Sequence, residues 1–545
     1  MRSLLLGVTF AVLACNGGHR GEGDPLEPDE GDDDGGKGDS PFDPAECVAG
    51  PEVTPHEPAP FELYPQPRAV EIGEEAADVT TACVDTHALA DHDRLDALVP
   101  ARLAAHGLTT ASLDCGCDYI LYFAAAEPDE LGDAGDNPER HAAQVSIENG
   151  RAVARLFGAS ERAALYALDA ALALLEPREE GGGMIHTATI ADWPGFRQRG
   201  IIEGVYGPDC DTPDIYRTPW LVDERADAIM LMSTLRENTF IYGPKCDPYS
   251  RALWDEPYPE DEATLVRVAL HEAERSMIDF VWAVSPGGPV ADFDLLAGKI
   301  DAMRDLGVSH FAIFLDDIDD HSAPDQLETI LALDSYIKAS APEEHLILVG
   351  TTYCSDPEAP WVCGGPNEYT DRFGAELPAD TQVLWTGLDV IPDTMEAADM
   401  VDINQSLRRR VTIWDNFPRD ELAFRGRSAD LVDAVAGYFS NPVLNEYPVP
   451  GLPTRTFFQV LGPIADYLWH PDRYDADPSF DTWQPILDGL VNEGACGACA
   501  VEVPGWTCTE PHAIGFCDPN TGCWSEHPCP GGCTVGAPGV ADLCR

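Results

Sequence analysis

Basic residues are scarce in this sequence: 33 lysines and arginines stand against 96 aspartates and glutamates, so the 545 residues carry a formal net charge of −63. Such a charge repels the phosphates of nucleic acids and anionic membranes, which argues against a nucleic-acid-binding protein. It also disfavours polyanionic substrates. Long apolar runs are equally scarce. The only marked one lies near the amino terminus, and it is too short to cross a bilayer.

That apolar run has the features of an export signal. Arg2 supplies a positive charge, residues 4–13 are apolar, and the sequence VLAC that ends at Cys15 is similar to the lipobox of bacterial lipoproteins. We therefore expect residues 1–15 to be a lipoprotein-type signal peptide with Cys15 lipidated. The membrane would then be reached only through this anchor, and the protein would lie in the bacterial cell envelope or on the outer surface. The alternative is an ordinary signal peptide and a secreted protein.

Histidine clusters are also lacking. The 14 histidines form no ligand group, so we expect no metal cofactor and no other cofactor. Of the 17 cysteines, 16 remain when Cys15 is set aside, and an even number in an exported chain favours disulfides. Eight of them lie within residues 495–545, which predicts a small disulfide-rich module. Cys496 and Cys499 have the spacing of zinc ligands, but no second pair completes a zinc ribbon.

The chain before the main domain divides by composition. Residues 16–58 are rich in Gly, Asp, Glu and Pro, and are predicted to be an acidic disordered linker. Residues 59–190 combine short strands, such as Asp118–Ala124, with an amphipathic helix at Glu161–Leu175. This mixture indicates a smaller α/β accessory domain without a recognisable chemical motif.

From residue 191 to 490, apolar β-rich runs alternate with helical patterns. Eight such runs predict an α/β fold with a parallel (β/α)8 TIM barrel as the catalytic domain. The runs are Arg199–Gly207, Thr239–Lys245, Asp279–Gly287, His310–Ile318, His345–Tyr353, Thr381–Val390, Arg410–Pro418 and Asn441–Tyr447. Helical patterns between them include Trp220–Asn238, Glu260–Met277, Asp292–Leu306 and Gln326–Ala341.

Polar and aromatic side chains follow these strands at their carboxyl ends. In a barrel of this class the chemistry lies at that rim. Core packing alone would not place carboxylates, lysine, amides and aromatic rings together there, whereas a cup that binds a sugar needs all of them. The candidates include Gly204, Tyr206, Lys245, Asp316, Asp317, Tyr353, Trp414, Asn416 and Asn441.

Asp316 and Asp317 follow the buried strand FAIFL. Successive residues of a regular strand point to opposite faces, so both carboxylates reach the site only if the backbone turns there. Two carboxylates so close together cannot both ionise without an electrostatic cost, which favours a proton on one of them. A protonated carboxyl at this rim would be a general acid, whereas Asp319 and Asp320 are expected to be solvated turn residues.

Five segments in order along the chain resemble glycoside hydrolase family 84. They are RGIIEGVYG at 199–207, YGPKCDPY at 242–249, Trp254 with EPYP at 256–259, SPG at 285–287 and DDI at 316–318. The family comprises β-N-acetylglucosaminidases, including protein O-GlcNAcases and enzymes once labelled hyaluronidases. The resemblance covers about residues 59–490, because members commonly carry an α/β domain before the barrel.

The resemblance implies roles for individual residues. Asp317 would be the general acid/base, and Asp316 would orient and stabilise the substrate's acetamido nitrogen. The acetamido oxygen would attack the anomeric carbon, which gives an oxazoline intermediate and retention. Tyr353 and Trp414 would wall the acetamido pocket. The other expected substrate-binding residues are Gly204, Tyr206, Lys245, Asn416, Asp420 and Asn441.

We therefore predict a retaining exo-β-N-acetylglucosaminidase that removes terminal β-linked N-acetylglucosamine from glycans or glycoproteins. One alternative is a hyaluronidase-type hydrolase, which the acidic charge disfavours. Another is an inactive carbohydrate-binding protein, which would not need the two adjacent carboxylates.

The sequence departs from the family pattern in three places. Asp420 follows Asn416 by four residues where five are expected, so Glu421 could take its place. About ten extra residues, 208–217, follow the first strand, and Cys246 stands where the family usually has Asp. Because Cys210 lies in this insertion, a Cys210–Cys246 disulfide is attractive. Cys354 and Cys363 could similarly close the loop after the fifth strand, although spacing alone establishes neither pair.

Overall fold

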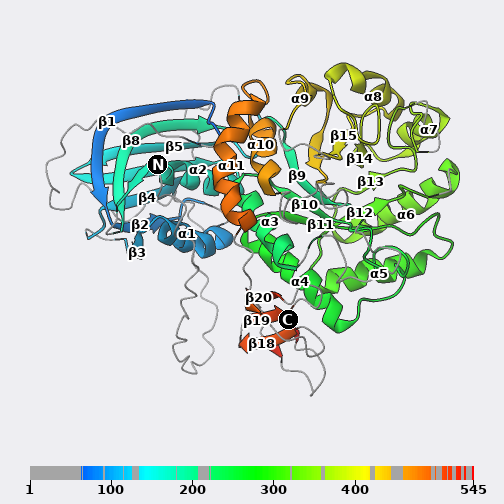
Figure 1. The fold of residues 1–545 in the computed structure, drawn as a ribbon, viewed down its shortest axis with the longest axis horizontal. Coiled ribbons are helices and arrows are strands. Elements are labelled where there is room, and N and C mark those ends of the chain that lie inside the picture. Colours follow the sequence, from blue (N-terminus) through cyan, green and yellow to red (C-terminus); the bar gives the residue numbers. More distant parts are fainter. Residues whose placement is uncertain are drawn as a thin grey trace, which may run out of the picture. The chain divides into compact units, whose positions relative to one another are not determined.

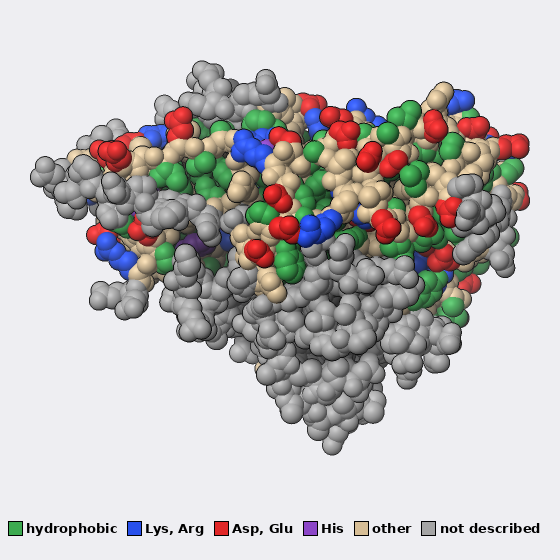
Figure 2. Space-filling view, turned by 45° about the horizontal axis from the view of Figure 1, so that its top comes forward, with side chains coloured by type: hydrophobic (Ala, Val, Ile, Leu, Met, Phe, Trp, Pro, Cys, Tyr) green, Lys and Arg blue, Asp and Glu red, His purple; other side chains and the backbone are tan. Residues whose placement is uncertain are grey.

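The structure is a computed structural model of the chain. It describes residues 63–544 except 64, 90–91, 114–115, 125–133, 179–180, 207–219, 221, 319–321, 357–361, 418–423, 443–457, 493–496, 499–505, 512, 518–522, 529–532 and 535–542. The predicted signal peptide, Cys15 and the acidic linker lie outside these residues. The chain divides into two compact units that meet in sequence between Asp192 and Trp193. Figure 2 shows acidic side chains dispersed over one face of the described residues. None of the described helices is long and apolar enough to span a membrane.

Within the described residues, the first unit contains a mixed sheet and two helices (Figure 1). The strand order is β1-β8-β5-β6-β4-β2-β3, with β7 paired to β8. Helix α2 begins after Ser160, whose hydroxyl accepts a hydrogen bond from the backbone N–H of Ala163, and its mostly buried residues lie against β5 and β6. The elements are β1 (Ala69–Val79), β2 (Thr81–Asp85), α1 (Asp93–Ala105), β3 (Thr109–Ala111), β4 (Tyr119–Ala124), β5 (His141–Glu148), β6 (Arg151–Gly158), α2 (Glu161–Leu172), β7 (Leu175–Pro177) and β8 (Gly183–Asp192).

The second unit contains a closed barrel of eight parallel strands, which confirms the predicted fold class. Its strands are β9 (Gln198–Glu203), β10 (Thr239–Tyr242), β11 (Asp279–Val284), β12 (His310–Phe314), β13 (Ile347–Val349), β14 (Gln382–Trp385), β15 (Thr412–Asp415) and β16 (Gly437–Ser440). Its helices are α3 (Val222–Thr234), α4 (Glu260–Arg275), α5 (Phe293–Asp305), α6 (Ala323–Ser340), α7 (Glu368–Glu376), α8 (Val401–Leu407, preceded by the 3-10 turn Ala397–Met400), α9 (Leu431–Ala434), α10 (Phe458–Trp469) and α11 (Ala476–Asn492).

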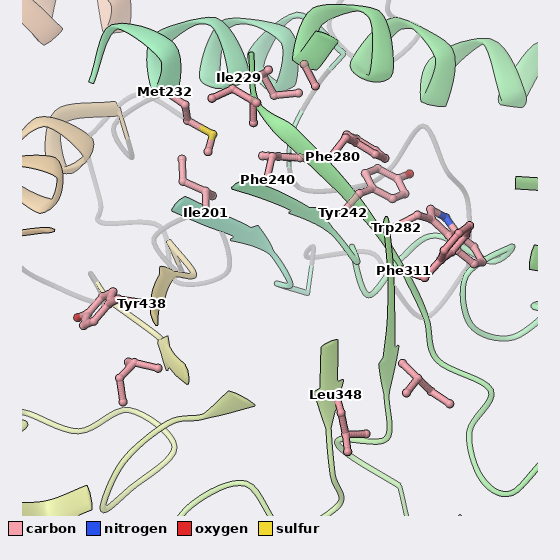
Figure 3. Packing of buried hydrophobic residues seen from close by; sticks show 14 of the residues in the cluster. Ile201, Ile229, Met232, Phe240, Tyr242, Phe280, Trp282, Phe311, Leu348 and Tyr438 are labelled. Carbon is pink, nitrogen blue, oxygen red and sulfur yellow. The ribbon is translucent and has the colours of Figure 1, made fainter. Parts of the chain in front are cut away.

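Alternation along the strands creates two separate apolar layers. Side chains on one face fill the barrel interior, and side chains on the other face pack under the helices. On β9, for example, Ile202 belongs to the interior layer and Ile201 to the outer one. Figure 3 shows the outer layer, where Ile229 and Met232 of α3 lie close to Ile201 and Phe240. This parity decides which residues at the strand ends can point into the barrel mouth.

The position predicted for the eighth strand is wrong. Residues 441–447 were expected to form it, but β16 is Gly437–Ser440 and ends just before Asn441. The short segment GYFS shows the required alternation, because Tyr438 belongs to the outer layer and Phe439 to the interior one. Asn441 is therefore placed at the carboxyl end of the strand, with the other site candidates.

The carboxyl-terminal region forms small antiparallel sheets. The strands are β17 (Gly497–Ala498), β18 (Trp506–Glu510), β19 (Ala513–Cys517), β20 (Cys523–Pro528), β21 (Cys533–Thr534) and β22 (Leu543–Cys544). A disulfide joins Cys508 to Cys533. Trp506 and Ile514 are buried and belong to the outer apolar layer of the barrel. This region is thus packed onto the barrel unit.

Candidate active site

Nearly all predicted site residues lie at the carboxyl ends of the barrel strands. Gly204 and Tyr206 follow β9, Lys245 follows β10, Asp316 and Asp317 follow β12, Tyr353 follows β13, Trp414 and Asn416 lie at the end of β15, and Asn441 follows β16. Asp420 and Glu421 lie outside the described residues, as does the insertion 208–217. The described candidates are joined to one another by hydrogen bonds, an ion pair and ring contacts.

Asp316 is a buried carboxylate with one occupied and one free oxygen. Phe314 lies in the barrel interior and Leu315 in the outer layer, so strand parity turns Asp316 inward. The Lys245 ammonium donates a hydrogen bond to Oδ2, and both side chains are almost fully buried. Oδ1 is buried and has no hydrogen-bond partner. Because buried carboxylate oxygens normally have donors, this atom is available to an N–H or O–H of a ligand.

Asp317 reaches the same rim because the chain leaves the strand conformation. Its φ of +56° is in the left-handed region, which few residues other than glycine adopt. Its carboxylate accepts hydrogen bonds from the phenol of Tyr206 at 3.0 Å and from the phenol of Tyr353 at 3.1 Å. Asp317 itself is exposed. The turn expected from the sequence therefore separates the two carboxylates into a buried, ion-paired group and an accessible group.

The two phenols are suited to act as permanent donors. Burial raises the pKa of Tyr206 far above its usual value, and the charges of Asp317 and Asp316 raise it further, whereas Arg251 opposes the shift. Burial also raises the pKa of Tyr353, again with contributions from both carboxylates. Both phenols thus keep their protons at neutral pH and stabilise negative charge on Asp317.

Aromatic rings surround the Lys245 ammonium and form one wall of the site. The ammonium lies 5.5 Å from the ring centroid of Trp414 and 5.9 Å from that of Tyr206. The rings of Trp414 and Phe314 are 5.4 Å apart. Gly204 lets Trp414 approach the end of β9, because a Cβ at residue 204 would lie 3.0 Å from the indole atom Cζ2. The buried Nε1 of Trp414 has no partner, so a second polar group faces an unfilled contact.

Two amides tie together the strand ends beside this wall. Gly204 donates its backbone N–H to Oδ1 of Asn441 at 3.0 Å. Asn441 Nδ2 donates to Oδ1 of Asn416 at 2.7 Å, and Asn416 Nδ2 donates to the carbonyl of Val390 at 2.7 Å. These bonds fix the orientation of both amides and link β9, β15 and the end of β16. Each amide nitrogen retains a second N–H that a sugar hydroxyl can use.

Several supporting residues were not predicted. Asp247, two residues after Lys245, is completely buried and accepts hydrogen bonds from the phenols of Tyr242 at 2.9 Å and Tyr258 at 2.7 Å. It anchors the loop that carries Lys245. Ser285, at the end of β11, has a buried hydroxyl without a partner. Both residues lie in quoted family segments, so their position at strand ends was the available signal.

Buried ion pairs behind the rim hold the strand ends from outside. On β15, Asp415 accepts two hydrogen bonds from Arg427, at 2.9 and 2.6 Å, and one from Tyr438. On β9, Glu203 accepts two from Arg225 at 2.6 Å each. Because Asp415 and Glu203 point outward, their neighbours Trp414 and Gly204 face the mouth.

Among the described residues, no group of three or more His, Cys, Asp or Glu side chains could hold a metal ion.

An (β/α)8 barrel with two adjacent carboxylates among aromatic and amide side chains at its carboxyl rim defines a glycoside hydrolase. Residues 199–496, more than half of the chain, match the family model described as beta-N-acetylglucosaminidase. The chain belongs to this family, glycoside hydrolase family 84, as the resemblance of its motifs indicated.

Similar proteins agree with this assignment. Protein O-GlcNAcase from Rattus norvegicus and that from Mus musculus are each 26% identical over 265 residues, which cover 45% of this chain and 28% of the relative. The match thus spans little more than a quarter of these relatives. The solved structure of CpGH84B is 25% identical, with a TM-score of 0.64 over 80% of this chain and 75% of the other. The structure of CpGH84D shows the same fold, with 20% identity and a TM-score of 0.65 over 78% and 72% of the two chains.

Proposed function

We propose that this protein is a retaining exo-β-N-acetylglucosaminidase that uses the acetamido group of its substrate as the nucleophile. The observation that carries the proposal is the unequal environment of two adjacent carboxylates. Asp316 is buried, and its Oδ2 is paired with Lys245 while its Oδ1 has no partner. Asp317 is accessible, and its carboxylate accepts hydrogen bonds from two phenols. Two carboxylates in such different environments suit two different tasks.

Asp317 would supply and recover the proton. In the first step its carboxylic acid protonates the glycosidic oxygen while the bond from that oxygen to the anomeric carbon breaks. Tyr206 and Tyr353 stabilise the carboxylate that results, because their hydroxyls donate to both of its oxygens. In the second step the carboxylate takes a proton from the water that attacks the anomeric carbon. The bond from that carbon to the acetamido oxygen breaks, which regenerates the acetamido group, and the acid is restored.

Asp316 would act on the acetamido group. Its Oδ1 can accept a hydrogen bond from the amide N–H, which increases electron density on the acetamido oxygen as that oxygen attacks the anomeric carbon. The product is a protonated oxazoline whose N–H still donates to Asp316. Lys245 holds Asp316 in place through Oδ2. In the usual retaining mechanism, two carboxylates flank the bond about 5 Å apart, one of them as nucleophile. Carboxylates on consecutive residues favour substrate assistance instead.

The substrate class is proposed to be terminal β-linked N-acetylglucosamine on glycans or glycoproteins. Side chains from β9, β10, β13, β15 and β16 surround the carboxylate pair, which favours one enclosed sugar over a long chain lying across the rim. The net charge of −63 disfavours a polyanion such as hyaluronan.

The disulfides Cys83–Cys117, Cys354–Cys363 and Cys508–Cys533 support export to an oxidising compartment. The proposal includes a lipid anchor at Cys15. Cells given a labelled fatty acid should label the wild type but not Cys15→Ala.

The test is hydrolysis of an aryl β-N-acetylglucosaminide by the wild type, Asp316→Asn and Asp317→Asn. We expect wild-type turnover with retention of the anomeric configuration, inhibition by a thiazoline mimic of the oxazoline, and at least a hundredfold lower kcat/KM for each variant. For Asp317→Asn, a substrate with an activated leaving group that needs no proton should restore much of the first step. Sugar binding without any wild-type turnover would instead identify a carbohydrate-binding protein, and faster cleavage of hyaluronan would replace the substrate assignment.

A further inference from the structure

The loop after β13 carries both a site residue and a disulfide. Tyr353, whose phenol donates to Asp317, is followed immediately by Cys354, and Cys354 is bonded to Cys363 as the sequence suggested. Cys354 and Cys363 are fully buried in the barrel-interior cluster that contains Tyr353. The disulfide is therefore a direct neighbour of the group that contacts the acid/base.

The disulfide joins the two sides of a small backbone ladder around Tyr353. The N–H of Tyr353 donates to the carbonyl of Val362 at 3.0 Å, and the N–H of Gly365 donates to the carbonyl of Cys354 at 3.2 Å. On the other side, the carbonyl of Tyr353 accepts from the N–H of Thr386 at 2.9 Å. The segment that returns at residue 362 thus holds the backbone of Tyr353, and the disulfide holds that segment.

Lys245, which binds the other carboxylate, is also followed directly by a cysteine in a disulfide. Cys246 is disulfide-bonded and buried, whereas the expected partner Cys210 lies outside the described residues. Tyr353 and Lys245, which donate to the two carboxylates, are therefore each followed by a disulfide-bonded cysteine. Of these two disulfides, Cys354–Cys363 has both of its cysteines among the described residues.

We propose that the Cys354–Cys363 disulfide is a positioning element for the general acid/base: it fixes Tyr353, and through Tyr353 it fixes the carboxylate of Asp317. This rests on the proposed function. Asp317 has an unusual left-handed backbone conformation and an exposed side chain, so its orientation depends on the two phenols. Without the disulfide, backbone hydrogen bonds hold the segment at Val362 to Tyr353 without a covalent link. A misplacement of about 1 Å at a reacting group costs on the order of a hundredfold in rate.

The test compares Cys354→Ala/Cys363→Ala with Cys508→Ala/Cys533→Ala, which removes a disulfide from the carboxyl-terminal sheets. We expect the first variant to lose up to about tenfold in kcat, as for loss of the phenol itself, and the second to stay within about twofold of the wild type. The pH–rate profile of the first should move to higher pH, because a hydrogen bond from a phenol stabilises a carboxylate and this bond is weakened. A purely structural disulfide would lower thermal stability and leave this profile unchanged.

A cycle with Tyr353→Phe shows whether the disulfide acts through the phenol. Once the phenol is absent, removal of the disulfide should cost at most about twofold more in kcat, so the effects are strongly non-additive. Fully additive losses, or wild-type kcat and pH profile in Cys354→Ala/Cys363→Ala, would overturn the proposal. If that variant is not recovered folded, Cys363→Ala alone replaces it. A wild type without turnover refutes the proposed function, whereas an active wild type matched by the variant refutes only the role of the disulfide.

Discussion

Replacing Lys245 by Met should leave a charge stranded in the barrel mouth. The Lys245 and Asp316 side chains are only 3% and 5% exposed, and Oδ1 of Asp316 already lacks a partner. Without the ammonium, neither oxygen of the carboxylate has a donor. Removing one member of a buried ion pair costs about 3–5 kcal/mol, so we expect the free energy of unfolding to fall by about this amount. kcat/KM should fall as well, because Lys245 no longer holds the Asp316 carboxylate in place.

A double-variant cycle separates the effect of losing the ion pair from the effect of altered side-chain packing. Lys245→Met/Asp316→Asn removes both charges, and replacement of a whole buried pair is often neutral, so this variant should recover most of the lost stability while remaining inactive. The assay is denaturant unfolding followed by tryptophan fluorescence. Arg372→Met is the control, because Arg372 on α7 pairs with Glu376 and both side chains are exposed, at 45% and 41%. Its loss should be at most about 1 kcal/mol. An equally small loss for Lys245→Met would refute the reasoning.

Three further changes probe the site and its surroundings. Tyr206→Phe and Tyr353→Phe each remove one hydrogen-bond donor to the Asp317 carboxylate. Because hydrogen bonds to charged groups contribute about 1.5–3 kcal/mol, each change should lower kcat about tenfold and move the pH–rate profile to higher pH. Gly204→Ala places a Cβ 3.0 Å from the adjacent indole, so thiazoline binding should weaken about tenfold in a titration. Burial lowers the pKa of Lys299 to about 8 in the folded protein. Above that pH the unfolded chain therefore binds more protons than the folded one, so stability rises with pH. Relative to Lys299→Met, the wild-type free energy of unfolding should rise by about 2 kcal/mol between pH 7 and pH 10.

Each of these changes has a control on the same chain. Tyr336→Phe removes a phenol that donates to Asp301 on the surface, and it should leave the pH profile unchanged. Gly288→Ala adds a Cβ that meets nothing within 4 Å, so it should not alter inhibitor binding. A Lys299→Met curve parallel to the wild type from pH 7 to pH 10 would contradict the pH argument, because the other titrating groups are common to both chains.

Strand parity explains why much of the barrel could be predicted from the sequence. Runs such as FAIFL must be buried on both faces, and eight of them alternating with amphipathic helices leave few alternatives to a barrel. The carboxyl-end rule then collects Lys245, Asp316 and Asn416 at one rim without any knowledge of contacts. The eighth strand was misplaced because GYFS is short, and its polar continuation at Asn441 resembled the start of a strand.

Contacts between distant segments could not be predicted. The pairing of Lys245 with Asp316, the two phenols on Asp317 and the chain of amides from Gly204 to Val390 depend on backbone positions that only the closed barrel supplies. The outward pairs behind the rim were missed for the same reason, since an arginine twelve residues after Asp415 gives no local signal. The pairing of Cys354 with Cys363 was suggested as a way to close the loop after the fifth strand, although spacing alone did not establish it.

The most direct test of substrate assistance is the rate of hydrolysis of aryl β-glucosaminides whose N-acetyl group carries zero, one, two or three fluorine atoms. Fluorine withdraws electrons from the acetamido oxygen without changing the leaving group. If that oxygen is the nucleophile and Asp316 assists it, log(kcat/KM) should fall steeply and steadily with each fluorine, while binding of the product sugars changes little. A rate independent of fluorination, together with a covalent sugar adduct on a protein carboxylate, would contradict the account.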